Sequence, residues 1–391
     1  MDYNELMPLA QTNASATETN LLIETPEIRL PRYASVEDAV KSLRPAQPLR
    51  CMHPEKLRAT VSEFVTKFPG QTFYAVKVNS DPYVLQTVWA GGCRNFDVAS
   101  LNEIKLTRGM FPTARLAFMH PIKSREAIRA AYAEYGVRDF AVDTFEELHK
   151  ILEETQLSKG IVAADLAIHV RLAMPKGSAS HDLSGKFGAA PEAAAKLLKD
   201  AAQVAAKVGL CFHVGSQCMD PVSYTEALDR AGEVIKASGV QLDVLDVGGG
   251  FPVSYPDCVP PSQEAYFTAI SAGVKKLKLP KSCQVWAEPG RALATPAETL
   301  IVRVELRKGN ALYINDGGYG SLLDGMMLGQ RWPVQQIRPR RRVEKKLIPF
   351  TFYGPTCDSL DKMAGPFMLP EDMREGDWIA IGMQGAYCAS M

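Results

Sequence analysis

Between residues 72 and 295, short apolar runs alternate with longer amphipathic stretches, and this alternation constrains the fold more than any other feature of the chain. A strand-like run followed by a stretch of helical period is the pattern of a βα unit. Eight such units match a (β/α)8 barrel, although an open doubly wound sheet alternates in the same way. We therefore predict an α/β fold and favour a TIM-like barrel. The predicted strands span residues 73–78, 95–98, 115–118, 139–142, 166–171, 210–213, 242–247 and 284–287.

Helix signals fall between these runs. Thr144 precedes Phe145, Glu146 and Glu147, which is the order of an N-cap followed by acids in the first helical turn. Gly209 and Gly239 stand where two helices should end, since glycine favours the position after a helix. The predicted helices span residues 101–109, 124–135, 144–154, 191–208, 221–238 and 263–277.

After residue 296 the helical stretches fade and strand-like alternation takes over, which predicts a second, all-β domain. Its predicted strands span residues 299–306, 311–315, 347–353 and 377–382. We divide the chain into a flexible leader, an N-terminal segment that joins the β domain, a cofactor-binding barrel and the β domain. These parts cover residues 1–25, 26–50, 51–295 and 296–391 respectively.

The charge balance argues against a protein that coats nucleic acid. Lys and Arg together number 44, as do Asp and Glu, so the formal net charge is zero. Contacts to phosphates need a large basic excess, which this chain lacks. Basic residues gather in one cluster, and we interpret that cluster as a solvated loop. It comprises Arg338, Arg340, Arg341, Arg342, Lys345 and Lys346.

No apolar run approaches the length of about 20 residues that spans a bilayer, and the first residues lack the basic start of a secretory signal. The eight cysteines form no CxxC pair, and in a chain of 391 residues they do not indicate a disulfide framework. The sequence assigns no metal ligands. We therefore predict a soluble cytoplasmic protein with free thiols and with neither a membrane nor a nucleic-acid partner.

Chemically reactive side chains stand at the ends of most predicted strands, where a (β/α)8 barrel holds its active site. Each alone has an ordinary structural explanation, such as an ion pair or a lysine whose stem is buried. Together, a lysine nucleophile, a glycine-rich phosphate cradle, a carboxylate and a flat imidazole suit pyridoxal phosphate. In chain order these residues are Lys77, Asp97, His120, Arg171, His213, Gly248, Gly249, Gly250, Glu288 and Arg291.

Nine motifs sharpen this prediction. They are FYAVKVNSDP at 73–82, FDVAS at 96–100, LSGKFG at 183–188, FHVGSQ at 212–217, LDVGGGFP at 245–252, AEPGR at 287–291, NDGGYGS at 315–321, GPTCDSLD at 354–361 and GAY at 385–387. Through these motifs the chain resembles the fold-type III pyridoxal-phosphate decarboxylases, which act on ornithine, lysine, arginine and diaminopimelate. In detail it is most similar to the bacterial branch of ornithine decarboxylases.

The resemblance implies a role for each matching residue. Lys77 would hold the cofactor covalently, Glu288 would pair with the pyridine nitrogen, and His213 would stack on the ring. A polar network that orients Lys77 would comprise Asp97, Glu103 and Arg171. The phosphate would be surrounded by Ser216, Gly248, Gly249, Gly250, Gly290, Arg291 and Tyr387.

The resemblance also implies a homodimer with two shared active sites. Cys357 would enter the partner's site and protonate the carbanion, and Asp358 would accept a hydrogen bond from the distal amine of the substrate. Tyr319 would lie on the substrate side. Relatives from higher organisms carry a further acid after the YGS motif, where Asp324 is the only acid here, so either Asp324 substitutes or Asp358 acts alone. The chain ends at Met391, whereas family members usually continue with a strand bearing a phenylalanine that lines the site.

Taken together, these residues predict the decarboxylation of a basic L-amino acid, with ornithine giving putrescine as the favoured reaction. Lysine or diaminopimelate decarboxylation is the alternative, although the chain lacks the Arg-containing run that holds a second carboxylate. An alanine racemase would need a tyrosine base where this chain has Cys357. A remote alternative is an inactive regulator similar to antizyme inhibitors, but such proteins lose cofactor residues that this chain keeps.

Overall fold

The structure is a computed structural model that describes residues 30–156, 165–181, 185–338 and 346–388. The predicted leader, residues 1–25, lies outside these ranges, as do Arg340, Arg341, Arg342 and Lys345 of the basic cluster.

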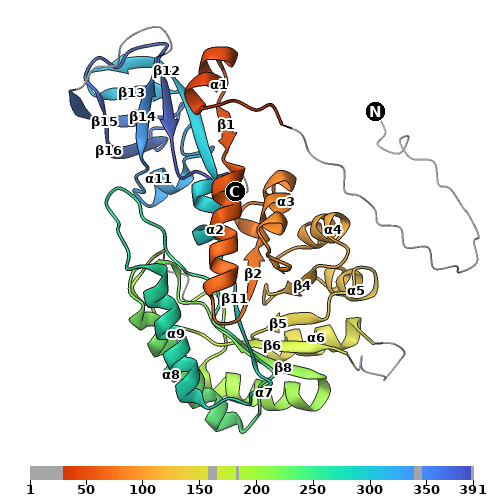
Figure 1. Cartoon of the computed structure of the whole chain (residues 1–391). Coiled ribbons are helices and arrows are strands. Elements are labelled where there is room, and N and C mark those ends of the chain that lie inside the picture. Colours follow the sequence, from red (N-terminus) through yellow and green to blue (C-terminus); the bar gives the residue numbers. More distant parts are fainter. Residues whose placement is uncertain (1–29, 157–164, 182–184, 339–345, 389–391) are drawn as a thin grey trace, which may run out of the picture. The chain divides into compact units, whose positions relative to one another are not determined.

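Eight parallel strands form a closed barrel, which confirms the predicted TIM-like fold over an open sheet (Figure 1). Around the barrel the strand order is β10-β11-β2-β3-β4-β5-β6-β8, so neighbouring strands mostly follow one another in the chain. The strands are β2 (Gln71–Ala75), β3 (Asn95–Val98), β4 (Arg115–Phe118), β5 (Asp139–Val142), β6 (Ala167–Arg171), β8 (Lys207–Cys211), β10 (Val244–Asp246) and β11 (Gln284–Ala287).

Helices lie outside these strands (Figure 1). Ser100, Ser124 and Thr144 cap three of them, each accepting a hydrogen bond from the backbone N–H three residues later. Gly239 ends another in the left-handed conformation, at φ 66°, as its position in the sequence predicts. The helices are α2 (Pro54–Lys67), α3 (Pro82–Ala90), α4 (Leu101–Met110), α5 (Arg125–Ala133), α6 (Phe145–Glu154), α7 (Pro191–Val204), α8 (Val222–Ser238) and α9 (Gln263–Leu277).

Two predicted boundaries around the sixth barrel strand are wrong. Helix α7 ends at Val204, and β8 begins at Lys207, so Gly209 lies inside a strand and ends no helix. A Cβ atom on Gly209 would lie 2.2 Å from Nδ1 of His169, so glycine is needed where this strand faces the neighbouring imidazole.

The first strand of the barrel also ends earlier than predicted, at Ala75, and a 3-10 turn, η1 (Val76–Val78), carries Lys77.

The barrel interior contains an aromatic and ionic cluster below the strand ends. Phe73 stacks on Trp286 with ring centroids 4.2 Å apart. Arg115 donates two hydrogen bonds to Asp139, which also bonds Nε2 of the fully buried His169. This cluster fills the barrel, so the space for a ligand lies at the carboxyl ends of the strands.

A seven-stranded sheet forms the second unit of secondary structure. Its order is β14-β17-β12-β13-β15-β16, and β1 (Leu49–Met52) pairs antiparallel with β12. A separate core, including Trp332, Phe350 and Phe352, packs within this sheet. The other strands are β12 (Glu298–Lys308), β13 (Ala311–Ile314), β14 (Val334–Ile337), β15 (Leu347–Tyr353), β16 (Lys362–Pro370) and β17 (Trp378–Ile381); β14 and β16 are absent from the predicted strands.

Short elements connect these parts. A two-stranded sheet joins β7 (Ala179–His181) to β9 (Ser216–Cys218). The remaining helices are α1 (Val36–Leu43), α10 (Arg291–Ala294), the 3-10 turn η2 (Thr295–Ala297) and α11 (Leu323–Met327). Within the described ranges, no helix has the length and apolar character needed to cross a bilayer.

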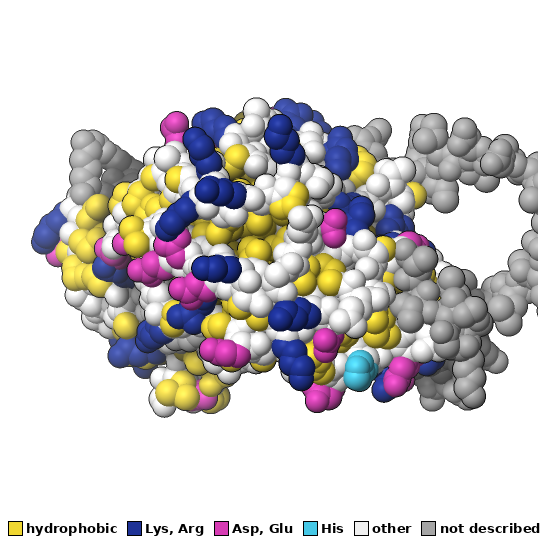
Figure 2. Space-filling view, turned by 90° about the horizontal axis from the view of Figure 1, so that it is seen from below, with side chains coloured by type: hydrophobic (Ala, Val, Ile, Leu, Met, Phe, Trp, Pro, Cys, Tyr) yellow, Lys and Arg dark blue, Asp and Glu magenta, His cyan; other side chains and the backbone are white. Residues whose placement is uncertain are grey.

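Charges of both signs are interspersed over the molecular face drawn in Figure 2, in keeping with the balanced composition. One member of the basic cluster departs from the solvated-loop prediction. The side chain of Arg338 is only 6% exposed and pairs with Asp377 at 2.6 Å and with Asp372. The loop interpretation is therefore wrong for Arg338, because two acids of the β16–β17 connection draw it into the sheet.

We predict that Arg338→Ala destabilises the fold by about 3–5 kcal/mol, because it removes the cationic partner of the buried Asp377 carboxylate and leaves that charge unbalanced. Chemical denaturation followed by circular dichroism measures this change. Lys346→Ala is the control, since Lys346 pairs with Glu371 in the open, where such pairs contribute about 0–1 kcal/mol. Equal unfolding midpoints for the two variants would contradict the structural role of Arg338.

Candidate active site

Most of the residues predicted to bind the cofactor line one cavity at the carboxyl ends of the barrel strands; Asp97, Glu103, Arg171 and Gly248 are not in its lining. Its lining comprises Ala75, Lys77, His213, Ser216, Gly249, Gly250, Phe251, Glu288, Gly290, Arg291 and Tyr387. These residues follow four different barrel strands and include one residue, Tyr387, from beyond the last strand of the sheet. Barrel closure therefore gathers side chains that lie far apart in the sequence.

Lys77 lines this cavity from the turn that follows β2. Its Nζ donates to Oδ2 of Asp97 at 2.6 Å, and Asp97 is the third residue of β3, the neighbouring strand. Desolvation lowers the pKa of Lys77, but the charges of Asp97 and Glu288 outweigh it and raise that pKa above its ordinary value. Lys77 is therefore a cation in the free protein, held in place by a buried carboxylate.

Glu288 directly follows β11 and shares its surroundings with a second acid, Asp246, the last residue of β10. Burial, together with the charges of Asp246 and Asp97, raises the pKa of Glu288 well above its usual range. Asp246 accepts the N–H of Gly248 at 2.8 Å, and Glu288 Oε1 has no hydrogen-bond partner within the described part of the chain. The sequence analysis missed Asp246, although an acid inside an apolar strand is a signal that could have found it.

His213 lies two residues beyond β8. Burial, helped by the charges of Arg171 and Lys77, lowers its pKa to about 3, so the imidazole is neutral at physiological pH. Its Nδ1 accepts the N–H of Gly215 at 3.0 Å, which places the ring proton on Nε2. A neutral, flat ring is suited to stacking against a flat cofactor.

Two glycines of the triplet after β10, Gly249 and Gly250, line the cavity, and added side chains there would collide with neighbouring parts of the protein. A Cβ atom on Gly249 would lie 3.0 Å from Nε2 of His213, and Gly250 has φ 109°, which side chains rarely adopt. Backbone N–H groups in such a turn form a cradle for anions.

Arg291, the first residue of α10, places a buried cation beside the glycine turn. It donates to Ser216 Oγ at 3.1 Å and to the Tyr255 hydroxyl at 3.2 Å. Its guanidinium lies 4.9 Å from the ring centroid of Tyr387 and 3.4 Å from Asp324. The cavity thus has a cationic end at Arg291 and an acidic end at Glu288.

These residues fit pyridoxal phosphate. The unpartnered Oε1 of buried Glu288 matches a pyridine N–H, and the neutral His213 matches a ring face. The glycine turn, Ser216 and Arg291 match the phosphate. Lys77 supplies the amine to which the cofactor aldehyde would attach.

Glu103 and Arg171, the other predicted members of the polar network, do not line this cavity, and neither does His120. Glu103 caps α4, accepting the N–H of Ala99 at 2.8 Å. Arg171 ends β6, with its guanidinium 5.3 Å from the centroid of the Phe187 ring. His120, beyond the end of β4, packs its ring edge-to-face against Phe187 at 5.1 Å. Asp97 is thus the member of the network in direct contact with Lys77.

Cys357 and Asp358 do not line this cavity. They lie on the exposed loop between β15 and β16, beside a different hollow that Tyr313 and Tyr353 help to line. Tyr319 donates its hydroxyl to Asp358 Oδ2 at 2.5 Å. The structure therefore joins Tyr319 to Asp358 but leaves both, with Cys357, outside the site built around Lys77.

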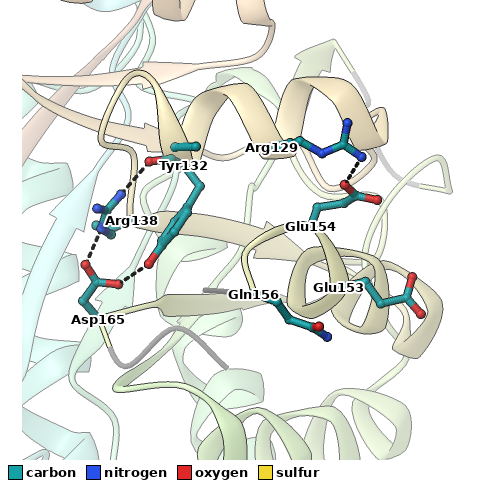
Figure 3. Close-up of a pocket in the computed structure, with 8 residues that line it drawn as sticks. Arg129, Tyr132, Arg138, Glu153, Glu154, Gln156 and Asp165 are labelled. Atoms are coloured by element: carbon teal, nitrogen blue, oxygen red, sulfur yellow. Dashed lines mark hydrogen bonds and ion pairs between the residues drawn. The ribbon is translucent and has the colours of Figure 1, made fainter. Parts of the chain in front are cut away.

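A further hollow lies on the outer helices α5 and α6 and carries none of the predicted site residues (Figure 3). Four of its charges pair with one another: Arg129 with Glu154 at 2.5 Å, and Arg138 with Asp165. The Tyr132 hydroxyl also donates to Asp165 at 2.8 Å. We therefore place the candidate active site at the strand ends.

Comparison with known families agrees with this geometry. Residues 54–295, which include every barrel strand, match the family model described as "Pyridoxal-dependent decarboxylase, pyridoxal binding domain". The chain belongs to this family. Pyridoxal phosphate is the cofactor of these decarboxylases. The relatives of the chain are decarboxylases of basic amino acids, and we assign this chain to the same class of enzyme.

Three relatives show how far the likeness extends. The lysine/ornithine decarboxylase of Selenomonas ruminantium is 35% identical over 324 residues, which cover 81% of this chain and 78% of that protein. The crystal structure of the lysine/ornithine decarboxylase of Vibrio vulnificus with cadaverine has a TM-score of 0.74 and 32% identity, covering 91% of this chain and 94% of that one. Antizyme inhibitor 2 of Xenopus laevis is 31% identical over 346 residues, covering 81% and 71% respectively.

We predict that Asp97→Asn lowers the pKa of Lys77, because it removes a carboxylate that favours the charged amine. Since the neutral amine is the nucleophile, the pH at which pyridoxal phosphate labels Lys77 should fall. Borohydride trapping across a pH series, with mass spectrometry to locate the label, measures this midpoint. Asp165→Asn, on the outer surface, is the control; an unchanged or raised midpoint in Asp97→Asn would contradict the prediction.

Proposed function

We propose that this decarboxylase converts L-ornithine to putrescine and carbon dioxide. The cavity that unites Lys77, His213, Glu288 and Arg291 carries the proposal. Pyridoxal phosphate, when bound, supplies a cationic ring that takes up the electron pair left by the departing carboxylate. The choice of ornithine rests on the relatives, one of which is named a lysine/ornithine decarboxylase.

Each residue of the cavity has a role in cofactor binding that follows from its charge. Lys77 provides the amine that anchors the cofactor, and Asp97 orients it at 2.6 Å. Burial and the charge of Asp246 raise the pKa of Glu288, so this carboxyl group would share a proton with the pyridine nitrogen of the bound cofactor. Neutral His213 would cover one face of the cofactor ring without adding a competing charge.

We propose that a second copy of the chain completes the site by supplying Cys357 and Asp358. Cys357 is exposed, and exposed apolar side chains accompany it: Leu360 is 67% exposed and Tyr319 is 55% exposed. Apolar side chains gathered on one exposed surface are typical of a protein interface. Within such a dimer Cys357 would deliver the proton to the carbon that loses its carboxylate.

The distal ammonium of the substrate would meet one carboxylate, that of Asp358. Tyr319 orients Asp358 through its hydroxyl. Asp324, the other predicted candidate, lies 3.4 Å from Arg291 and so serves the phosphate end of the cavity. One turn further along, Met327 and Leu328 are 68% and 51% exposed, so this part of the segment offers apolar contacts.

The expected outcome of a substrate panel is carbon dioxide and putrescine from ornithine, with a smaller yield of cadaverine from lysine. Product amines are measured by chromatography after incubation with pyridoxal phosphate. Lys77→Ala should abolish both the reaction and the absorbance of the bound cofactor. If ornithine, lysine, arginine and diaminopimelate all gave no amine, the proposed function would be refuted.

Lysine is the leading alternative substrate, since the Vibrio vulnificus relative was solved with both cadaverine and putrescine. A regulator similar to antizyme inhibitors is a second alternative, because one relative bears that name. The presence of Lys77, Glu288 and Arg291 in one cavity favours catalysis over this alternative. Cofactor absorbance in the native protein that disappears in Lys77→Ala separates the two.

We predict that mixing inactive Lys77→Ala with inactive Cys357→Ala restores activity, to roughly a quarter of the native value when half of all chains carry each change. Mixed dimers would contain one site with both an intact Lys77 and an intact Cys357. Activity is assayed after subunit exchange, with each variant alone as the control. Failure to recover activity, once exchange is verified by labelled subunits, would count against shared sites.

We also propose a cytoplasmic location. All eight cysteines are free thiols in the structure, and five of them are partly or fully accessible to solvent: Cys51, Cys258, Cys283, Cys357 and Cys388. Thiols of this kind persist in reducing compartments.

A further inference from the structure

A buried carboxylate outside the cofactor cavity joins the two segments that carry Lys77 and Tyr387. Glu298 is the first residue of β12, and its side chain is only 4% exposed. Oε1 accepts a hydrogen bond from Asn79 Nδ2 at 2.7 Å, and Oε2 accepts one from Arg50 Nη1 at 2.9 Å. Both carboxylate oxygens are therefore in use, each with a different segment of the chain.

The first of these segments is the turn that bears Lys77. Asn79 closes η1 by donating its backbone N–H to Val76 at 3.1 Å. Its carbonyl oxygen accepts the Tyr74 hydroxyl at 3.0 Å, and its side chain also donates to the carbonyl of Gly385 at 3.0 Å. Asn79 is 1% exposed, so its amide has no access to bulk water. Glu298 thus fixes the residue that ends the lysine turn.

The second segment is the loop that bears Tyr387. Arg50 reaches from β1 to the carbonyl of Cys388 and to Ser321 Oγ at 3.2 Å. The backbone N–H of Tyr387 donates to the carbonyl of Val78, in the lysine turn, at 2.9 Å. The lysine turn and the Tyr387 loop therefore hold each other directly, and Glu298 bonds to the residues that brace both.

Charge explains why this position needs an acid. Burial raises the pKa of Glu298, whereas Arg50 and Asn79 favour its ionised form. A buried carboxylate that accepts hydrogen bonds from a cation and from an amide is well satisfied. Removing the charge leaves the Arg50 guanidinium and the Asn79 amide competing for fewer acceptors, and unsatisfied buried donors are costly.

We infer that Glu298 is a positioning residue for the cofactor. Through its hydrogen bonds to Asn79 and Arg50 it fixes the position of the Lys77 turn relative to the Tyr387 loop, on either side of the cavity. Within the described residues, the hydrogen bonds of the Glu298 side chain go to Asn79 and Arg50, neither of which lines the cavity, so Glu298 acts through these two partners. This inference rests on the cofactor site proposed above.

Glu298→Gln tests the inference, because the amide has the same shape but offers one acceptor where the carboxylate has two. The apparent Kd for pyridoxal phosphate should rise about tenfold, the loss expected for one hydrogen bond to a charged group. Titration of the cofactor-free protein, followed by absorbance of the bound cofactor, measures this Kd. Borohydride trapping at Lys77 gives a second readout that does not depend on turnover, and its rate should fall as well.

Glu63→Gln is the matched control, since Glu63 pairs with Lys67 at 2.6 Å on the exposed face of α2. Arg50→Gln is a second test, because the Arg50 side chain is 31% exposed and its replacement leaves the core intact. It should weaken cofactor binding in the same direction as Glu298→Gln. Thermal unfolding of the cofactor-free variants identifies any variant that is unfolded at the titration temperature.

The outcomes are distinct. A Kd within twofold of native in folded Glu298→Gln and Arg50→Gln, or an equal rise in Glu63→Gln, overturns the inference. If Glu298→Gln is unfolded, Arg50→Gln decides by the same criterion. Native protein that does not bind pyridoxal phosphate refutes the proposed function, and with it this inference. Native binding with unchanged variants refutes the inference alone.

Discussion

Three buried carboxyl groups around a single lysine set the electrostatics of the cavity. Asp97, Asp246 and Glu288 lie at one end, where burial raises the pKa of Asp246 and of Glu288. The negative charge of Asp97 outweighs the effect of burial on Lys77 and raises the pKa of its amine. Arg291 and the glycine turn make the other end positive. A ligand that combines a protonated ring nitrogen with a phosphate matches this polarity, because each of its charges meets the opposite sign in a region with little water.

Much of the fold could be predicted because buried parallel strands leave apolar runs of recognisable length. The runs at 95–98, 115–118, 139–142 and 284–287 coincide with strands of the barrel. The boundary between α7 and β8 could not be predicted from local pattern, since apolar residues at 204–206 suit either element. In the sequence, Gly209 has the position of a residue that ends a helix. The structure shows instead that a side chain at this position would collide with His169 on the neighbouring strand.

The cofactor residues were found through motifs, whereas the residues that support them were not. Asp246 is hidden within an apolar strand, and Tyr255 bonds Arg291 from a loop without any motif. Asn79 and Glu298 are 219 residues apart, and nothing local in either segment records that they meet. For Arg338 the sequence led to a wrong prediction. A run of charged residues suggests a solvated loop, and only the structure shows that Asp372 and Asp377 pair with this one arginine and bury it.

The pairing of β1 with β12 has a consequence for how the chain assembles during synthesis. Leu49 is opposite Ile301, so the first strand of the sheet leaves the ribosome long before its neighbour exists. At roughly 5–20 residues per second the delay is on the order of tens of seconds, during which the intervening α/β region can fold. During this interval the backbone N–H and C=O groups of β1 that later pair with β12 have no partner strand. The nascent chain is then most prone to pair wrongly with other nascent chains.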